Sequence, residues 1–330
     1  MPFTPVNTSL GALLLYQGST GLFQHNGRPF GVSSMLSGCV AKPSRENIPV
    51  ILGMISSIAP VYKFAPSLLP TYPVPPATWE AALITAGTGF LVGWGTKNDN
   101  GCTSGHMLCG LSRLSPRSII ATGIFFTTAL ITANSGIGAS VSPSPDGQPL
   151  YMPVYPTNGE FGFMATAVVL SQIINSVLVP GTFRRSKASA TAYSYIAGLQ
   201  FGLGLLISGM ASPEKVLGFF NWINPTLLDP SLALVMLFGV GPGLWSYLRM
   251  KDEYGNERGQ KPPTLTDRFN LSTATISDID LRFVAGAIAF GIGWGLCGVC
   301  PGPGLLRSVL QPLWGASWLG GYWLGSLLGF

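Results

Sequence analysis

The sequence predicts an all-α integral membrane protein, and three features of its composition support that prediction. Hydrophobic residues make up 47% of the 330 residues and charged residues only 9%, whereas soluble domains are about a quarter charged. The apolar residues fall in blocks long enough to cross a bilayer. The chain also contains 43 glycines, and small residues allow membrane helices to pack closely.

The apolar blocks predict about nine transmembrane helices, because a helix needs roughly 20 mostly apolar residues to cross the hydrocarbon core. The blocks lie at about 9–25, 47–64, 77–96, 116–136, 160–181, 188–208, 230–250, 280–296 and 313–329. Polar, Gly-rich stretches interrupt the first and the eighth of them.

Four apolar segments rich in Gly or Pro lie between these blocks, at about 26–38, 98–114, 209–220 and 296–308. Non-helical backbone at membrane depth must be buried in protein or line a wet cavity. We therefore expect four re-entrant loops whose short helices aim their N-termini, and the positive ends of their dipoles, at the centre. The alternative is that these segments are ordinary loops outside the membrane.

The basic residues predict an orientation. Of the 18 Lys and Arg residues, only Lys63, Lys215 and Arg307 fall on the same side of the nine segments as the N-terminus. Since positive residues concentrate in cytoplasmic loops, we expect the N-terminus outside, the C-terminus in the cytoplasm, and the chain in the plasma membrane. The basic residues form no stripe with interleaved aromatics, so we expect no nucleic-acid partner.

A repeat divides the chain. The stretch 87–95 (GTGFLVGWG) recurs at 286–295 (GAIAFGIGWG), and each copy leads into a Gly-rich loop with a cysteine. Equivalent helices of the two units are five crossings apart, so the second unit is expected to be inverted relative to the first, an arrangement typical of transporters. The expected organisation is a first repeat (1–136), an external loop with a connecting helix (137–187) and a second repeat (188–330).

The cysteines and histidine near residue 102 leave several chemistries open. Cys102, His106 and Cys109 have the spacing C-x3-H-x2-C, which places them on one face of a helix. They could be packed core residues, or metal ligands with Cys297 or Cys300 as the fourth. They could also donate hydrogen bonds to a soft sulfur anion, the role we prefer.

The remaining candidates carry weaker signals. Cys297 and Cys300 form a C-x-x-C pair that could be a redox dithiol, although the β-α-β context of thioredoxins is absent. Lys215 could attract anions into an outer vestibule, or it could be a solvated neighbour of Glu214. We recognise no hydrolase, nucleotide or cofactor motif, so we expect neither an enzyme nor a cofactor.

Three long motifs carry a family resemblance. They are Gly101–Ser118 (GCTSGHMLCGLSRLSPRS), Leu206–Gly218 (LISGMASPEKVLG) and Gly293–Pro303 (GWGLCGVCPGP). Together they resemble the YeeE/YedE sulfur-transport family, with the chain similar to a fusion of two half-size members. The resemblance implies nine spans around four buried loops in an hourglass shape, and uptake of thiosulfate across a lipid bilayer.

The resemblance also implies roles for individual residues. Cys102 and Cys300 match loop cysteines that contact the ion transiently through S–H groups. His106, Cys109, Arg113 and Lys215 occupy matching motif positions, whereas Cys297 has no counterpart in the family. The thiosulfate carriers have a further cysteine in the first buried loop, near Gly31 of this chain, and Cys39 is the candidate to replace it.

Overall fold

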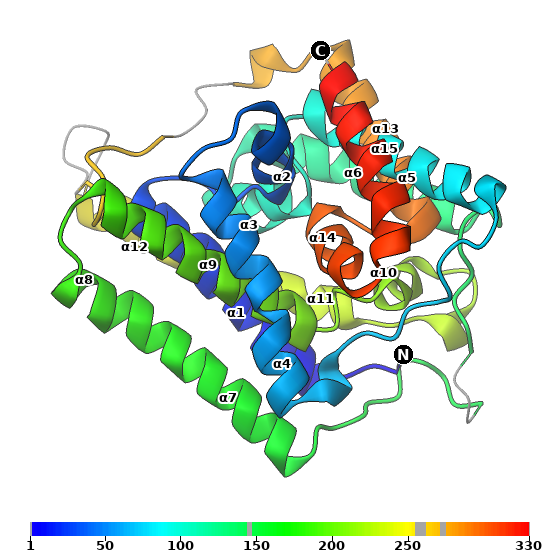
Figure 1. Cartoon of the computed structure of the whole chain (residues 1–330), viewed down its shortest axis with the longest axis horizontal. Coiled ribbons are helices and arrows are strands. Elements are labelled where there is room, and N and C mark those ends of the chain that lie inside the picture. The colour runs from blue at the N-terminus through cyan, green and yellow to red at the C-terminus, as the bar shows by residue number, and fades with distance from the viewer. Residues whose placement is uncertain (1, 144–146, 255–261, 271–274, 330) are drawn as a thin grey trace.

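The computed structural model describes residues 2–143, 147–254, 262–270 and 275–329, and the side chains within 250–254 are excluded. Regular structure in these ranges is helical, apart from one isolated bridge between Phe3 and Pro153. The C-terminal end lies at the top of the view in Figure 1, and the N-terminal end lies below the middle, to the right of centre. The predicted all-α class is therefore confirmed.

Nine long helical segments coincide with the nine predicted blocks. They are α1 (Pro5–Asn26), α3 with α4 (Asn47–Ser56, Ile58–Phe64), α5 (Trp79–Asn98), α6 (Pro116–Ala133), α7 through η4 to α8 (Asn158–Ile173, Ile174–Leu178, Val179–Thr182), α9 (Lys187–Ile207), α11 through η6 to α12 (Ser231–Val235, Met236–Val240, Gly241–Tyr254), α13 (Leu281–Cys297) and α15 (Pro312–Leu328).

Fewer than nine of these segments have the length and apolarity of an independent membrane span. Within the described residues five qualify: 47–64, 116–133, 158–182, 187–207 and 231–249. The bent pair α13–α14 gives a sixth. The structure thus has a multi-pass membrane architecture, while nine crossings remain a prediction. The helix α1 is too polar to qualify as an independent span. Its polar residues Gln17, His25 and Asn26 are buried in the protein, and a helix that is shielded from lipid can carry polar groups.

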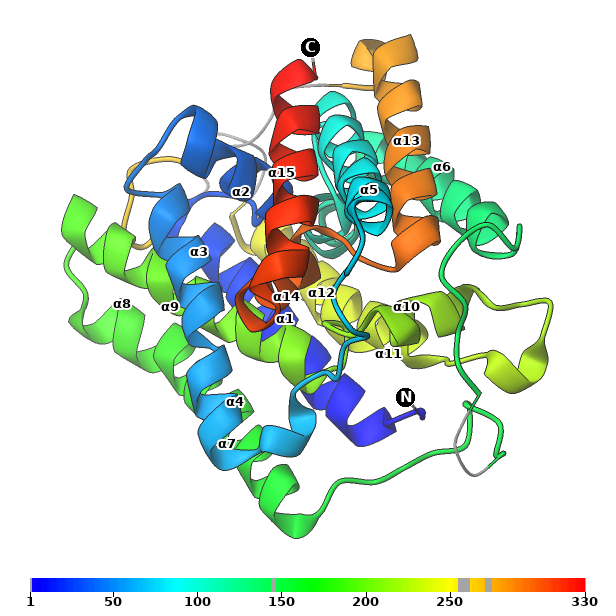
Figure 2. The same cartoon turned by 45° about the vertical axis from the view of Figure 1, so that its right-hand side comes forward.

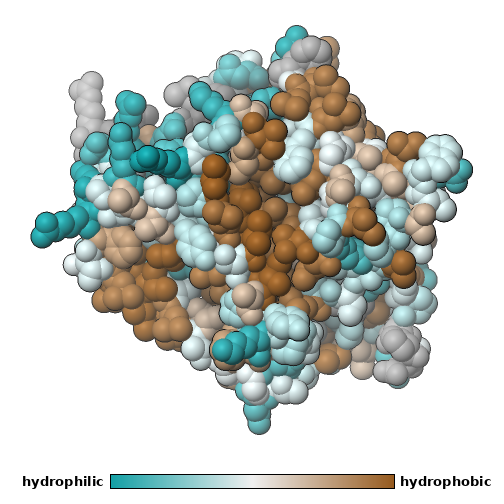
Figure 3. Space-filling model, in the orientation of Figure 1, coloured by the Kyte–Doolittle hydropathy of each residue, from teal (hydrophilic) through white to brown (hydrophobic). Residues whose placement is uncertain are grey.

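The surface agrees with a bilayer. An apolar area crosses the middle of the face in Figure 3, and hydrophilic residues gather at its upper-left and lower margins. On α7 the side chains of Phe161, Val169 and Leu170 are exposed. Exposed apolar surface of this extent marks contact with lipid or a partner.

Four short helices occupy the interrupted segments that the sequence indicated. They are α2 (Val32–Ala41), η2 (Thr103–Gly110, a π-helix followed by η3, Leu111–Arg113), α10 (Pro213–Phe220) and α14 (Pro301–Leu310). Each follows a long helix whose end is marked by a residue with positive φ: Gly27, Asn100, Gly209 and Gly298. Glycine and asparagine tolerate this left-handed conformation, so the chain can turn sharply into each short helix.

The long helices form two bundles, and each bundle contains helices from both predicted repeats (Figures 1 and 2). In one bundle α1 packs against α9 and α3 against α9, while η6 packs against α1. In the other, α5 packs against α13 and α15, and α6 against α13. The same set of contacts results if each helix is exchanged for its counterpart in the other repeat. The counterparts are α1 and α9, α3 and α11–α12, α5 and α13, and α6 and α15.

The exchanged partners run antiparallel. Near the start of α1, Gly11 lies against Ser208, whereas further along the helix Gly18 lies against Ala197. This direction is what two inverted units require, and it supports the predicted division into 1–136, 137–187 and 188–330, which stays a proposal.

Glycine faces set the closest helix crossings. On α5, a Cβ at Gly89 or Gly93 would overlap the backbone carbonyl of Trp318 or Tyr322 on α15. Reciprocally, Gly321 and Gly325 on α15 face carbonyl oxygens of α5. Both helices therefore present small residues four positions apart, the spacing that lets membrane helices approach backbone to backbone.

The glycine face predicts that two Gly→Ala variants of α5 differ in stability. Gly93→Ala is expected to lower the free energy of unfolding by about 1–3 kcal/mol, because the added methyl group must push α15 away. Gly87→Ala, on the same helix but with open space around the new Cβ, is expected to keep the wild-type stability or exceed it. Thermal unfolding in detergent measures both, and equal midpoints for the two variants would contradict the close crossing.

Candidate functional site

A cavity of about 60 Å³ lies where the four short helices meet. Its lining residues come from all four short helices or their entry loops and from the long helices beside them: Leu15, Val32, Cys102, Thr103, Ser104, Met107, Leu108, Phe201, Leu205, Met210, Val216, Leu232, Val235, Met236, Trp294, Cys300, Gly302 and Pro303. The set is mostly apolar and contains no charged side chain. Its polar side-chain groups are two thiols, two hydroxyls and one indole N–H.

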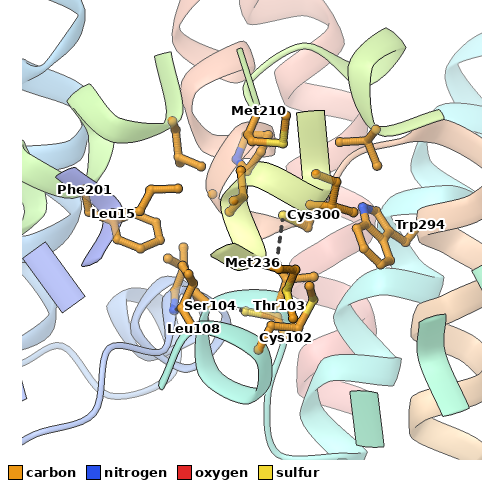
Figure 4. A pocket seen from close by; sticks show the side chains of 18 residues that line it. Leu15, Cys102, Thr103, Ser104, Leu108, Phe201, Met210, Met236, Trp294 and Cys300 are labelled. Carbon is orange, nitrogen blue, oxygen red and sulfur yellow. Dashed lines mark hydrogen bonds between the residues drawn. The ribbon is translucent and has the colours of Figure 1, made fainter. Parts of the chain in front are cut away.

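Cys102 and Cys300 hold equivalent positions in the two predicted repeats, and both line this cavity (Figure 4). Each is the N-cap residue of its short helix with extended backbone, φ −141° at Cys102 and φ −103° at Cys300. The Cys102 carbonyl accepts from the His106 N–H at 2.8 Å, and the Cys300 carbonyl accepts from the Gly304 N–H at 2.9 Å. The same local geometry therefore aims both thiols at one space.

Hydrogen bonds join the two loops. The Thr103 hydroxyl donates to the Cys300 sulfur at 3.4 Å, which is the contact drawn as a dashed line in Figure 4. The Cys102 sulfur lies 3.1 Å from the Ser104 hydroxyl. That hydroxyl also accepts from the backbone N–H of Val32, at the start of α2, at 3.0 Å. Three of the four short helices are thus linked directly around the two thiols.

The backbone supplies a positive potential to the cavity. The four short helices contain 10, 8, 8 and 10 residues, and in none of them does the N-cap side chain accept from the first turn. The positive dipole ends of these helices favour an anion, although Pro213, Pro301 and Pro303 supply no N–H and the Val32 N–H already donates to Ser104. An anion could therefore be held by backbone N–H groups, thiols and hydroxyls, without a fixed cation.

His106 does not line the cavity, although the sequence placed it there. Its Nδ1 lies 3.1 Å from the Ser118 hydroxyl and its Nε2 lies 3.2 Å from the backbone oxygen of Asp99. Both ring nitrogens are occupied, so the imidazole connects the end of α5 to the start of α6. Because the imidazole points toward Ser118 and Asp99, it does not converge with Cys102 and Cys109 on one metal position. Among the described residues, no group of three side chains could hold a metal ion.

Cys109 and Arg113 line a smaller pocket of about 20 Å³. The Cys109 thiol donates to the backbone oxygen of Phe30 at 3.5 Å. The Arg113 Nε donates to the Cys109 carbonyl at 3.0 Å, and its guanidinium lies 5.5 Å from the centre of the Phe23 ring. Leu108 lines both this pocket and the central cavity, so its side chain forms the partition between them.

Cys39 and Cys297 lie outside the cavity lining. Cys39 is seven residues beyond Val32 on α2, roughly 10 Å further along the helix, so it does not take the place of a first-loop cysteine. The Cys297 thiol turns back and donates to the carbonyl of Gly293 at 3.1 Å. The C-x-x-C spacing therefore does not bring both thiols to one point of the cavity.

Lys215 is buried and paired, in contrast to the solvated loop considered from the sequence. It is 2% exposed, and its Nζ lies 3.4 Å from the carboxylate of Asp229, itself 0% exposed. The ammonium also donates to Thr4, Ser231 and the backbone oxygen of Pro2. Lys215 also lines a pocket of about 190 Å³. Its contacts with Asp229, Thr4, Ser231 and Pro2 hold the N-terminal residues, α10 and α11 together.

Several residues of the site were missed by the sequence reasoning. Thr103 and Ser104 are ordinary hydroxyl residues inside the motif, and Asp229 stands just before a predicted span. The tryptophan of the repeated block, Trp294, lines the cavity. The repeat itself was a usable signal for Trp294, because it singled out the block that ends there.

Comparisons with known proteins place the chain in a family. A family of unknown function (DUF6691) matches residues 190–313. A protein of Xylella fastidiosa named "Probable transporter" is 36% identical over 129 residues, which is 38% of this chain and 89% of the relative. A second "Probable transporter" of the same species is 40% identical over 125 residues, covering 36% of this chain and 75% of the relative. The chain belongs to this family of probable transporters.

The lengths of these relatives bear on the repeat. An alignment that covers 38% of this chain but 89% of the relative means that the relative is less than half as long as this chain. A half-size relative is what the two-unit organisation leads us to expect.

The buried pair predicts the effect of removing Lys215. Lys215→Met is expected to lower the free energy of unfolding by about 3 kcal/mol or more, because it leaves Asp229 buried without its cation. Adding Asp229→Asn should recover part of the loss. Lys63→Met, at an exposed lysine, should change stability by less than about 0.5 kcal/mol.

Thermal unfolding of the purified variants in detergent measures these effects. A Lys215→Met protein with wild-type stability but slower anion uptake would contradict the structural role and restore the role of an anion attractor.

Proposed function

We propose that the chain carries a small sulfur-containing anion, most specifically thiosulfate, across the membrane through the central cavity. The observation that carries this proposal is the presence of Cys102 and Cys300 at the N-termini of two short helices in one cavity. Family membership supports transport, since the relatives are named as probable transporters. The resemblance to the YeeE/YedE family supports the sulfur anion.

The polar groups of the cavity suit such an ion. An anion that enters loses water and must find donors in exchange. Backbone N–H groups at the helix starts can bind its oxygens, and the thiols are weak donors suited to its terminal sulfur. Weak contacts also allow release, because conduction requires sites that an ion can leave.

A path through the protein would connect three pockets. The pocket that contains Arg113 lies beyond Leu108, and the one that contains Lys215 shares the α9–α10 loop with the cavity. In the predicted orientation these two pockets would open toward opposite sides of the membrane. Cys109 in the first pocket would then be a third thiol on the path, after Cys300 and Cys102.

The proposed organisation is two inverted units, 1–136 and 188–330, joined by 137–187. The proposed location is the plasma membrane, with the N-terminus outside and the C-terminus in the cytoplasm. The exchange of helix contacts between the units and the 15 basic residues on the predicted cytoplasmic side support these assignments.

The geometry favours transport over the alternatives raised by the sequence. A metal site needs Cys102, His106 and Cys109 to converge, whereas each has a different partner. A dithiol needs Cys297 beside Cys300, whereas the Cys297 thiol is bonded to its own helix.

The test is uptake of labelled thiosulfate into proteoliposomes. Cys102→Ala and Cys300→Ala are each expected to reduce uptake about tenfold or more, since each removes a donor to a charged ion, and Ser should rescue only partly. The matched controls Cys39→Ala and Cys297→Ala, which alter thiols outside the cavity lining, should retain most of the wild-type rate.

All four variants should elute as the wild-type protein does in size exclusion, so that a loss of uptake reports on the site. Wild-type uptake by both Cys102→Ala and Cys300→Ala would refute the cysteine pathway. An effect of Cys297→Ala as large as that of Cys300→Ala would favour the dithiol.

A further inference from the structure

Trp294 presents a buried hydrogen-bond donor that the protein itself does not use. The residue is 2% exposed and lines the central cavity. Among the described residues its indole Nε1 has no hydrogen-bond partner. A buried donor left unpaired costs free energy comparable to a lost hydrogen bond, and at a cavity wall this donor is available to a ligand that accepts from it.

Three aromatic rings fix the direction of this donor. The indole stacks on Phe290 at 5.9 Å with an interplanar angle of 6°. The rings of Phe220 and Phe125 meet it edge-on at 4.9 Å and 5.9 Å. In Figure 4 the nitrogen lies on the edge of the ring nearest to Cys300. The donor is therefore pre-organised toward the cavity rather than free to turn away.

We propose that the indole N–H of Trp294 donates a hydrogen bond to an oxygen of the transported anion. The inference rests on the proposed function and narrows its substrate class to anions that present both an oxygen acceptor and a soft sulfur atom. The thiols of Cys102 and Cys300 contact the sulfur end, and Trp294 contacts the oxygen end. The two kinds of donor together orient the ion in the cavity.

This arrangement gives selectivity without charge. A site built to donate a hydrogen bond rejects an ion that cannot accept it, because the buried donor then stays unpaired. The indole N–H is a donor only, so it cannot accept a hydrogen bond from the O–H group of a protonated acid. No charged side chain lines the cavity, which leaves the neutral donors and the helix N-termini to determine which anions bind.

The first test compares two tryptophan-to-phenylalanine variants. Trp294→Phe removes the N–H and keeps an aromatic side chain. Trp318→Phe is the matched control. Trp318 is also fully buried and its Nε1 likewise has no hydrogen-bond partner among the described residues, but it stacks between Trp314 and Tyr322 and lies outside the cavity lining. The dissociation constant for thiosulfate is measured from the concentration dependence of the thermal midpoint, and KM from uptake into proteoliposomes.

Trp294→Phe is expected to raise the dissociation constant and KM about tenfold or more, the loss of a hydrogen bond to a charged group. Trp318→Phe should leave both near wild type, although each variant loses a similar volume from the core. If Trp294→Phe binds thiosulfate as tightly as wild type, the inference is wrong and the indole is a packing residue.

A second variant distinguishes the loss of the N–H group from a loss of the folded structure. Incorporation of 3-benzothienylalanine at position 294 replaces the N–H by sulfur and keeps the shape of the ring. It should weaken binding as Trp294→Phe does, and wild-type binding by this variant would overturn the inference. A wild-type protein that shows neither uptake nor a thiosulfate-dependent midpoint would instead refute the proposed function itself.

Discussion

The close approach of helix backbones through glycine is the constraint on which the rest of the structure depends. Where α5 crosses α15, Gly89 and Gly93 leave room for carbonyl oxygens of the partner, and Gly321 and Gly325 do the same in return. In a bilayer the hydrophobic effect does not drive helix association, so van der Waals contact at such crossings must supply much of the stabilisation. The tight bundles in turn enclose the four short helices and keep lipid away from their irregular entry loops.

That enclosure explains where the protein places polarity. Protein surrounds the polar helix α1 and the Lys215–Asp229 pair, whose exposed fractions are 2% and 0%. The cavity, in contrast, has no charged lining and relies on helix N-termini, thiols, hydroxyls and an indole. An anion held by partial charges is bound less tightly than one held by an ammonium group, which suits a site that must release its ion.

The sequence predicted the positions of the helices and their interruptions, because apolar block length and Gly or Pro content are local properties. The residues 26–38 and 296–308 were expected to break the pattern, and α2 and α14 begin within them. The directions of side chains were not predictable in this way. His106 turns toward Ser118, and Lys215 pairs with Asp229, because contacts between separate helices decide both orientations. Spacing on one helix cannot reveal which neighbour a side chain meets.

The central claim is that one anion lies between the thiols of Cys102 and Cys300. The most direct measurement is a crystal structure with selenosulfate, in which selenium replaces the terminal sulfur of thiosulfate, located by its anomalous signal. The account predicts a selenium peak inside the central cavity, within contact distance of one or both cysteine sulfurs. A selenium peak only in the basic surface pocket of Arg45, Arg185 and Lys187, at an ion concentration that saturates uptake, would contradict it.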